Sequence, residues 1–147
     1  MGDSEPRPLV LVVDDDADHG YMLEALLEAD GFSVLIALSR AEARTILESR
    51  LVDVLVSDLS LGDGTALDLV KDLGPHRPRV AIVLSGFDSV DDVERTMRAG
   101  FDAHLAKPTP LDVLREVIAV GLRRRPSGVR LTNATVAVPT TSKRSAT

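Results

Sequence analysis

The stretch Val10–His19, VLVVDDDADH, places three consecutive aspartates directly after an apolar run. A short run of valine and leucine is typical of a buried β-strand. Neighbouring like charges repel one another, and a carboxylate loses hydration when it lies close to a core. The stretch therefore predicts a strand whose end carries negative charge that another part of the chain must balance.

A short apolar run followed by a helical pattern occurs five times along the chain. The predicted strands are Leu9–Val13, Phe32–Leu38, Val52–Ser57, Val80–Leu84 and Asp102–Ala106. The predicted helices are Asp18–Ala29, Ser39–Glu48, Thr65–Gly74, a helix from Asp88 or Ser89 to Ala99, and Leu111–Leu122, the last with Thr109 as N-cap and Pro110 in the first turn. Nearly continuous apolar strands predict an α/β fold with a parallel sheet covered by helices on both faces.

Composition narrows the classes of protein to which the chain can belong. Its 147 residues are 44% hydrophobic, enough for one domain, and contain no cysteine for disulfides or thiolate metal sites. The longest apolar runs are too short to cross a membrane. All 23 acidic residues precede Arg123, so the body is acidic and we expect neither nucleic acid nor a membrane as its partner. A cytoplasmic protein is the expectation.

The chain divides into three predicted parts. Residues 1–7 are polar and predict a disordered N-terminus, and residues 8–122 hold the five βα units. Residues 123–147 contain six basic residues and no acidic one, with many serines and threonines. Such a composition predicts a flexible, solubilising tail.

Polar side chains follow four of the predicted strands. Asp14–Asp16 follow the first and Asp58 the third, while Ser85 and Lys107 end the fourth and fifth. Ligands bind beyond the carboxyl ends of the strands in open parallel sheets. In a 2-1-3-4-5 strand order the first and third strands are neighbours, so their acidic ends would meet.

This set of residues has a coherent chemistry. Clustered carboxylates raise one another's pKa unless a cation lies among them, and an all-oxygen ligand set suits Mg²⁺. A carboxylate can also act as a nucleophile and form an aspartyl phosphate, whose oxygens a lysine and a hydroxyl would bind. Taken singly, each residue has an ordinary structural interpretation: a helix N-terminal cluster, a loop acid, a turn serine or a solvated lysine. Their common placement at one end of the sheet favours the functional interpretation.

The residues from Pro8 to Leu122 resemble the CheY-like receiver domain of two-component response regulators. The matching segments are LVVDDD, VDVLVSDLSLGDG, VAIVLSGFD and RAGFDAHLAKP, in the family's order and spacing. The resemblance implies a flavodoxin-like (βα)5 fold, a doubly wound parallel sheet with strand order 2-1-3-4-5.

The resemblance also implies roles for individual residues. Asp58 matches the phosphoacceptor, and Asp14 and Asp15 match the acidic pair that binds Mg²⁺ with Asp58. The backbone carbonyl of Ser60, two residues after the phosphoacceptor, would be a further metal ligand.

Two further positions complete the implied site. Ser85 falls at the family's switch serine or threonine, and Lys107 at its invariant lysine, where the Lys107-Pro108 peptide bond is expected to be cis.

Two positions depart from the family pattern. His104 stands where an aromatic switch residue is usual; it is either a second switch residue beside Ser85 or a partly exposed polar residue at a strand end. Gly62 replaces a common proline, which predicts a flexible loop after Asp58.

The implied function is a phosphorylation-activated signalling switch rather than an enzyme with an external product. A histidine kinase or a histidine phosphotransfer protein would supply the phosphoryl group. The face Asp88–Leu122 would then bind a downstream protein or form a phosphorylation-dependent homodimer. The chain would be a stand-alone receiver or a module excised from a hybrid histidine kinase.

Two other classes remain as alternatives. A pseudo-receiver would share the fold but serve only as an interaction module with an inactive site. A haloacid dehalogenase-like phosphohydrolase also uses aspartates after a first strand with Mg²⁺, but Asp16 and Ala17 fit its motif poorly. Phosphorylation of Asp58 or of Asp14 would discriminate between the receiver and the phosphohydrolase.

Overall fold

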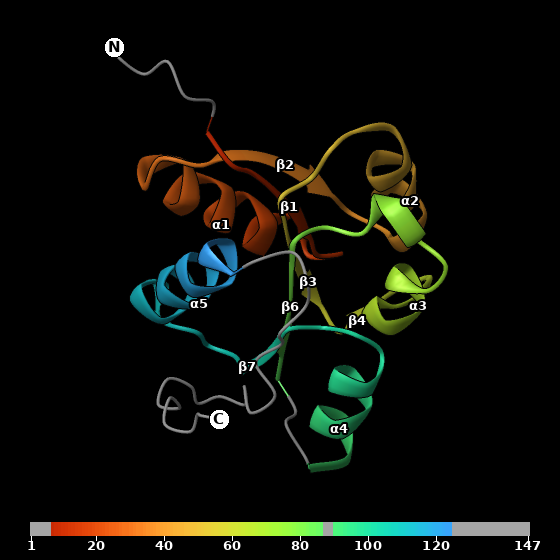
Figure 1. The fold of residues 1–147 in the computed structure, drawn as a ribbon. Coiled ribbons are helices and arrows are strands. Elements are labelled where there is room, and N and C mark those ends of the chain that lie inside the picture. Colours follow the sequence, from red (N-terminus) through yellow and green to blue (C-terminus); the bar gives the residue numbers. More distant parts are fainter. Residues whose placement is uncertain (1–6, 87–89, 125–147) are drawn as a thin grey trace.

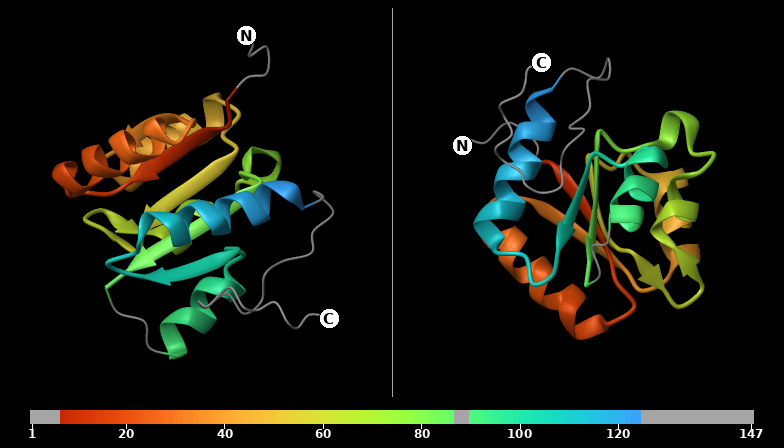
Figure 2. Two further views of the ribbon diagram at one scale, coloured as in Figure 1. Left: turned by 90° about the vertical axis from the view of Figure 1, so that its left-hand side faces the viewer. Right: turned by 90° about the horizontal axis from the view of Figure 1, so that it is seen from below.

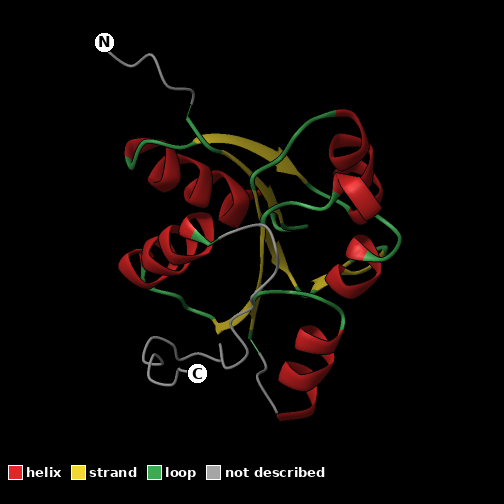
Figure 3. Cartoon of the chain, viewed as in Figure 1, coloured by secondary structure: helices red, strands yellow, loops and turns green. Residues whose placement is uncertain are grey.

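A five-stranded parallel sheet organises the chain, whose computed structural model describes residues 7–86 and 90–124. The sheet has the order β2-β1-β3-β6-β7, which among these five strands is the predicted 2-1-3-4-5 order. The predicted doubly wound α/β fold is therefore confirmed, with helices on both sides of the sheet (Figure 3). The strands are β1 (Leu9–Val13), β2 (Ser33–Ala37), β3 (Val54–Asp58), β6 (Val80–Ser85) and β7 (Ala103–Ala106).

The helices lie in two layers around this sheet (Figures 1 and 2). On one face, α1 and α5 pack against side chains such as Val12 and Ile82. On the other face, α2 and α3 pack against side chains such as Leu11 and Val83, and α4 lies on the same side next to β7. The bounds are α1 (Ala17–Ala29), α2 (Arg40–Ser49), α3 (Ala66–Val70), α4 (Val90–Arg98) and α5 (Leu111–Arg123). Because both faces are covered, the strands are apolar at nearly every position.

The sequence placed two helix ends wrongly. The helix predicted to continue to Gly74 ends at Val70, because Lys71 has an extended backbone with a ψ of 139° and Asp72 then adopts a positive φ of 62°. A short 3₁₀ turn, Gly74–His76, follows it. In the last helix Pro110 is the N-cap, because the Thr109 hydroxyl donates to the carbonyl of Ala106 at 2.7 Å and does not cap the helix.

A short antiparallel hairpin follows β3, in the segment where the sequence predicted a flexible loop. Its strands are β4 (Ser60–Leu61) and β5 (Gly64–Thr65). Leu61 is fully buried, so the hairpin is anchored to the core. The Thr65 side chain then accepts from the backbone N–H of Asp68 at 3.3 Å and caps α3.

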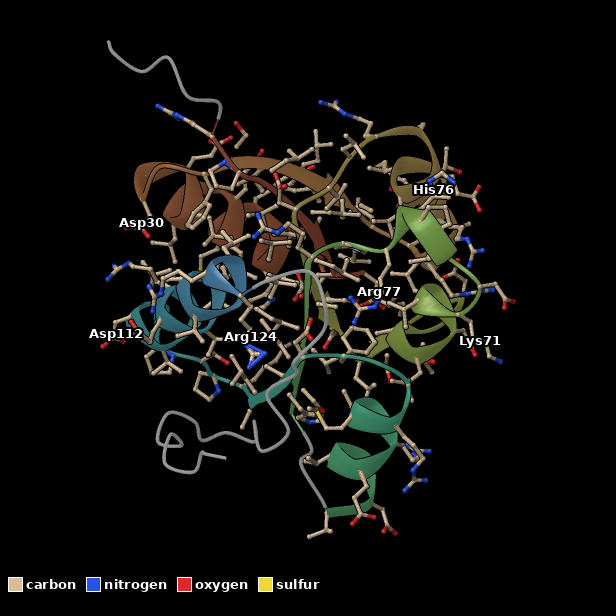
Figure 4. All side chains as sticks on the ribbon, viewed as in Figure 1. Asp30, Lys71, His76, Arg77, Asp112 and Arg124 are labelled. Carbon is tan, nitrogen blue, oxygen red and sulfur yellow. The ribbon has the colours of Figure 1, made fainter. Side chains whose placement is uncertain are left out.

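Two contacts fix α5 against the rest of the domain. Arg115 Nε donates to Asp30, which lies at the end of α1, at 2.8 Å (Figure 4). Further along α5, Gly121 permits a close approach to β6: a Cβ built there would lie 2.6 Å from a side-chain methyl of Val80. Any larger residue at position 121 would push the helix away from the sheet.

Several predictions fall on residues that the structure does not describe. These are positions 1–6 of the predicted N-terminal segment 1–7, the N-cap predicted at Asp88 or Ser89, and positions 125–147 of the predicted tail 123–147. The first residue of that predicted tail, Arg123, belongs to α5. Within residues 7–86 and 90–124, no helix combines the length and the apolar character needed to cross a membrane.

Candidate phosphorylation and metal site

Three of the predicted carboxylates meet at the carboxyl end of the sheet. Asp14 and Asp15 follow β1, and Asp58 is the last residue of the neighbouring parallel strand β3. Carboxylate oxygens of the three residues all lie within 4.8 Å of one another. The adjacency of β1 and β3 thus produces the convergence that the sequence predicted.

Asp14 is the most buried member of this cluster, at 3% exposed. Its Oδ1 accepts from the backbone N–H of Asp16 at 2.9 Å, and its Oδ2 contacts Nδ1 of His19. Lys107 Nζ lies 3.9 Å from the same Oδ2. Both oxygens of Asp14 are therefore held in place by neighbouring groups.

Lys107 brings the balancing positive charge from the end of β7. Its Nζ lies 3.1 Å from Asp58 Oδ1, which also accepts from the backbone N–H of Leu59 at 3.1 Å. Burial raises the pKa of Asp58 above its ordinary value; Lys107 opposes this rise and the charge of Asp14 adds to it. The Lys107-Pro108 bond is cis, as predicted.

The two predicted serines come from strands that end or begin near this end of the sheet, β6 and β4. Ser85 is a buried residue at the end of β6, and its carbonyl accepts from the backbone N–H of Lys107 at 2.8 Å. Ser60 opens the hairpin at an exposed position. A switching role for Ser85 and metal ligation by the Ser60 carbonyl both remain predictions.

The third aspartate of the opening stretch has a different role. The Asp16 side chain is the N-cap of α1 and accepts from the backbone N–H groups of Asp18 and His19 at 3.1 and 3.4 Å. The helix-capping interpretation therefore holds for Asp16, whereas Asp14 and Asp15 belong to the carboxylate cluster.

His104 is not the partly exposed residue that one interpretation of the sequence assumed. It is 2% exposed within β7, and its Nδ1 lies 3.1 Å from the hydroxyl of Thr96 in α4. Thr96 in turn donates to the backbone carbonyl of Asp92 at 2.8 Å. His104 thus connects β7 to α4 in the core, and a switching role stays a prediction.

His19 belongs to the site although the sequence pattern did not predict it. His19 lies in the first turn of α1, five residues after Asp14, and its ring contacts the Asp14 carboxylate. A residue at that spacing can reach back over the start of its helix. The motif DDDADH carries this signal, but a histidine in a first turn is more often only a surface residue.

The donor set fits a magnesium ion. The described residues around the cluster offer three carboxylates within ligand distance of one another, one of them buried and one half-buried. Mg²⁺ prefers such oxygen ligands and keeps several waters, which the exposed Asp15 permits. The high density of negative charge against a single nearby lysine also favours a divalent cation.

Comparison with known proteins agrees with this geometry. The family model for the response regulator receiver domain matches residues 10–119. The transcriptional regulatory protein ZraR of Salmonella typhimurium is 29% identical over 130 residues, covering 87% of this chain and 30% of that protein. The response regulator protein PilR of Pseudomonas aeruginosa is 32% identical over 120 residues, covering 81% of this chain and 27% of that protein. The chain thus spans less than a third of the length of these relatives.

Solved structures share the same fold. A two-component response regulator from Clostridium difficile superposes with a TM-score of 0.75 at 24% identity, covering 80% of this chain and 98% of that one. A Burkholderia pseudomallei response regulator with a phosphorylated aspartic acid and a calcium ion superposes with a TM-score of 0.71 at 27% sequence identity. The match covers 76% of this chain and 66% of that one. The beryllofluoride-activated NtrC4 receiver domain dimer superposes with a TM-score of 0.71 at 28% sequence identity, and the match covers 77% of this chain and 94% of that one. The chain therefore belongs to the response regulator receiver domain family, whose general function is a phospho-aspartate signalling switch.

Proposed function

We propose that this chain is a switch in a histidine-to-aspartate phosphorelay and that Asp58 is its phosphoacceptor. The observation that carries the proposal is the position of Asp58, at the end of a central strand between the carboxylates of Asp14 and Asp15 and the ammonium group of Lys107. A nucleophilic carboxylate next to a cation and a metal-binding pair is the arrangement that aspartyl phosphate formation requires.

Asp58 performs the covalent step. One of its carboxylate oxygens attacks the phosphorus of a phosphohistidine or of a small acyl phosphate. A new P–O bond forms, the bond between phosphorus and the donor breaks, and its electron pair leaves with the donor group. The Lys107 ammonium, 3.1 Å from Asp58 Oδ1, stabilises negative charge that accumulates on the phosphoryl oxygens.

Asp14, Asp15, Asp58 and the backbone carbonyl of Ser60 would hold Mg²⁺. When bound, the ion would neutralise phosphoryl oxygens and so lower the barrier to transfer. The chain's own part is to preorganise the ligands: Asp14 is fixed by the Asp16 N–H and by His19, and β1 and β3 keep the carboxylates at one edge.

The signal would leave the site through β6 and β7. A phosphoryl group on Asp58 offers an acceptor for the Ser85 hydroxyl, and Ser85 and Lys107 are joined by a backbone hydrogen bond of 2.8 Å. A shift of these residues would alter the face Asp88–Leu122, which binds the downstream partner. His104, buried against α4, would respond to the same shift.

The partners follow from this role. We propose that the chain is cytoplasmic, with a histidine kinase or histidine phosphotransfer protein as donor and a protein as target of the Asp88–Leu122 face. A phosphorylation-dependent homodimer has support from the NtrC4 receiver, which is a dimer in its beryllofluoride-activated form. The only catalysis proposed for the chain is its own phosphorylation and dephosphorylation.

Intact-protein mass spectrometry tests the proposal. The wild type and Asp58→Asn are incubated with acetyl phosphate and Mg²⁺, and the expected result is one added phosphoryl group on the wild type alone. An adduct that persists in Asp58→Asn would show that another residue is the nucleophile, and Asp14→Asn would then test the phosphohydrolase alternative. No adduct on either, together with no Mg²⁺ or beryllofluoride binding, would identify a pseudo-receiver.

A further inference from the structure

The hairpin after Asp58 is bonded to the N-terminus of α2, far along the chain from the aspartates of β1. Asp63, at the turn of the hairpin, accepts from the backbone N–H of Arg40 at 2.8 Å and from that of Ala41 at 3.1 Å, one with each carboxylate oxygen. Arg40 Nε donates in return to the backbone carbonyl of Asp63 at 3.3 Å. The first N–H groups of a helix have no partner within the helix, so Asp63 supplies a cap from a separate segment.

The geometry of the turn shows how closely it fits α2. Gly64 has a φ of +152°, and a Cβ built on it would lie 2.4 Å from Arg40 Nε. The positive φ favours glycine at this position, and any other residue would also require the Arg40 side chain to move away from the turn. The contact between the hairpin and α2 is therefore specific in shape as well as in charge.

The same hairpin borders the carboxylate cluster on its other side. A Cβ built on Gly62 would lie 3.7 Å from Asp15 Oδ2, so the turn residue adjoining Asp63 lies beside a cluster carboxylate, with room for a methyl group between them. Ser60, whose carbonyl is expected to ligate the metal, is the first residue of the hairpin. The segment Ser60–Thr65 thus connects the site with α2.

We propose that Asp63 is a positioning residue: by bonding the hairpin to the first turn of α2, it keeps Ser60 and Gly62 beside Asp15 and so raises the affinity of the site for Mg²⁺. This inference rests on the proposed function, since it concerns the same metal site. Binding linkage is reciprocal, so Mg²⁺ must in return stabilise the Asp63 contact with α2. The first turn of α2 becomes a second region that responds to the state of the site, apart from the Asp88–Leu122 face.

The electrostatics of Asp63 are consistent with this role. Hydrogen bonds from the backbone N–H groups of Arg40 and Ala41 lower the pKa of the Asp63 carboxyl below its ordinary value. The residue is therefore ionised at neutral pH, where a carboxylate binds the helix N-terminus most strongly.

The chain offers a matched control within the same helix. The Ser39 hydroxyl caps α2 by accepting from the backbone N–H of Glu42 at 3.0 Å. Ser39→Ala therefore weakens the N-terminus of α2 but leaves the bonds between Asp63 and the helix in place. If only the stability of α2 mattered to the site, Ser39→Ala and Asp63→Ala would act alike.

The test is calorimetric titration of the full chain with Mg²⁺. Loss of a residue that supports a metal ligand without touching the metal typically lowers the affinity about 10- to 100-fold. In Asp63→Ala the hairpin keeps its β-pairing and the buried Leu61. We therefore expect the lower end of that range, a roughly tenfold loss of Mg²⁺ affinity. Asp63→Asn keeps one acceptor oxygen, so its Mg²⁺ affinity should lie between those of Asp63→Ala and the wild type. Ser39→Ala should bind Mg²⁺ like the wild type, although it also lowers the melting temperature.

A second measurement needs no variant. Amide hydrogen exchange at Arg40 and Ala41 in the wild type should slow when Mg²⁺ is added, and the Leu47 amide in the last turns of α2 should respond less. Equal Mg²⁺ affinity of Asp63→Ala and the wild type, an equal loss in Ser39→Ala, or unchanged exchange at Arg40 and Ala41 would each overturn the role of Asp63. A wild type that neither binds Mg²⁺ nor gains a phosphoryl group would overturn the proposed function itself.

Discussion

Aspartates lie at both ends of the strands of the central sheet, and their contacts differ between the two ends. At the amino end, Asp53 accepts from the backbone N–H of Leu9 and Asp102 from that of Ala81, each at 2.8 Å. At the carboxyl end, Asp14, Asp15 and Asp58 have their oxygens within 4.8 Å of one another. The amino-end carboxylates accept from peptide groups of a neighbouring strand. At the carboxyl end, Asp14 and Asp58 accept instead from peptide groups within two residues along the chain, and they also face each other and the Lys107 ammonium group.

The difference separates structural from functional acids. A carboxylate that accepts from a peptide N–H compensates its own desolvation and strengthens the fold. Carboxylates that face one another repel, and the arrangement persists only where cations such as Lys107 offset the charge. Residue type and position beside a strand are the same at both ends, so the partner of each carboxylate decides its role.

The largest expected effect concerns metal affinity. Asp15→Asn removes a charged ligand from the cluster, and its effect on the Mg²⁺ dissociation constant should exceed the roughly tenfold cost of losing an outer-shell partner. Asp53→Asn, at the other end of the sheet, should bind Mg²⁺ like the wild type in the same calorimetric titration. A similar loss in both variants would remove the distinction between the two ends.

The next effect concerns the stability contributed by an amino-end carboxylate. Asp102→Ala leaves the N–H of Ala81 without its carboxylate partner, and a lost hydrogen bond to a charged group of this kind should cost about 1–3 kcal/mol in the free energy of unfolding. Urea denaturation measures this cost. Phosphoryl uptake by the folded protein should be unchanged, and Asp102→Asn, which keeps an acceptor oxygen, should lose less stability.

A smaller effect should distinguish the three consecutive aspartates from one another. Asp16→Ala removes the N-cap of α1, and the expected loss is about 1 kcal/mol of stability. Because Asp16 lies outside the carboxylate cluster, its Mg²⁺ titration should match that of the wild type. If Asp16→Ala instead weakened Mg²⁺ binding as much as Asp15→Asn, the cap would have to be counted as part of the metal site.

The smallest effect is a gain of stability on removing a charge. Folding raises the pKa of Asp58 above 3.8, so its protonated form stabilises the folded state below that pH, and this contribution is lost as the pH rises through the higher folded-state pKa. In the absence of metal, the melting temperature of Asp58→Asn should therefore be slightly higher than that of the wild type at pH 7. Near pH 4 the difference between the two melting temperatures should be smaller. A lower melting temperature for Asp58→Asn at pH 7 would show that the Lys107 ion pair outweighs the cost of burial.

The sequence predicted the parts of the molecule that depend on local pattern and on strand order. Apolar runs located all five strands of the sheet, and their order brought Asp14, Asp15 and Asp58 together with Lys107. Once the strands and their order are known, the residues at the carboxyl ends of neighbouring strands are also known. Those residues must lie close together, so the members of the cluster follow from the strand order.

The features that the sequence did not predict depend on contacts between segments. The bonds from Asp63 to α2 join residues 22 and 23 positions apart, and the burial of His104 depends on Thr96 in a helix that packs over it. His19 was missed for the opposite reason: its partner is nearby, but a histidine in a first turn has many ordinary uses. Such contacts are settled by packing, which residue patterns along one chain do not encode.

The close approach of Gly121 to Val80 fixes the C-terminal end of α5 against the start of β6. Val80 begins β6 and Ser85 ends it, so the contact of Gly121 with Val80 lies roughly 16 Å from the site end of that strand, at about 3.3 Å per residue. Mobile ions screen electric fields in solution over about 8 Å at physiological ionic strength. A charge added at Asp58 is therefore largely screened at the C-terminal end of α5, and a response there requires movement of a packed element such as α5 itself.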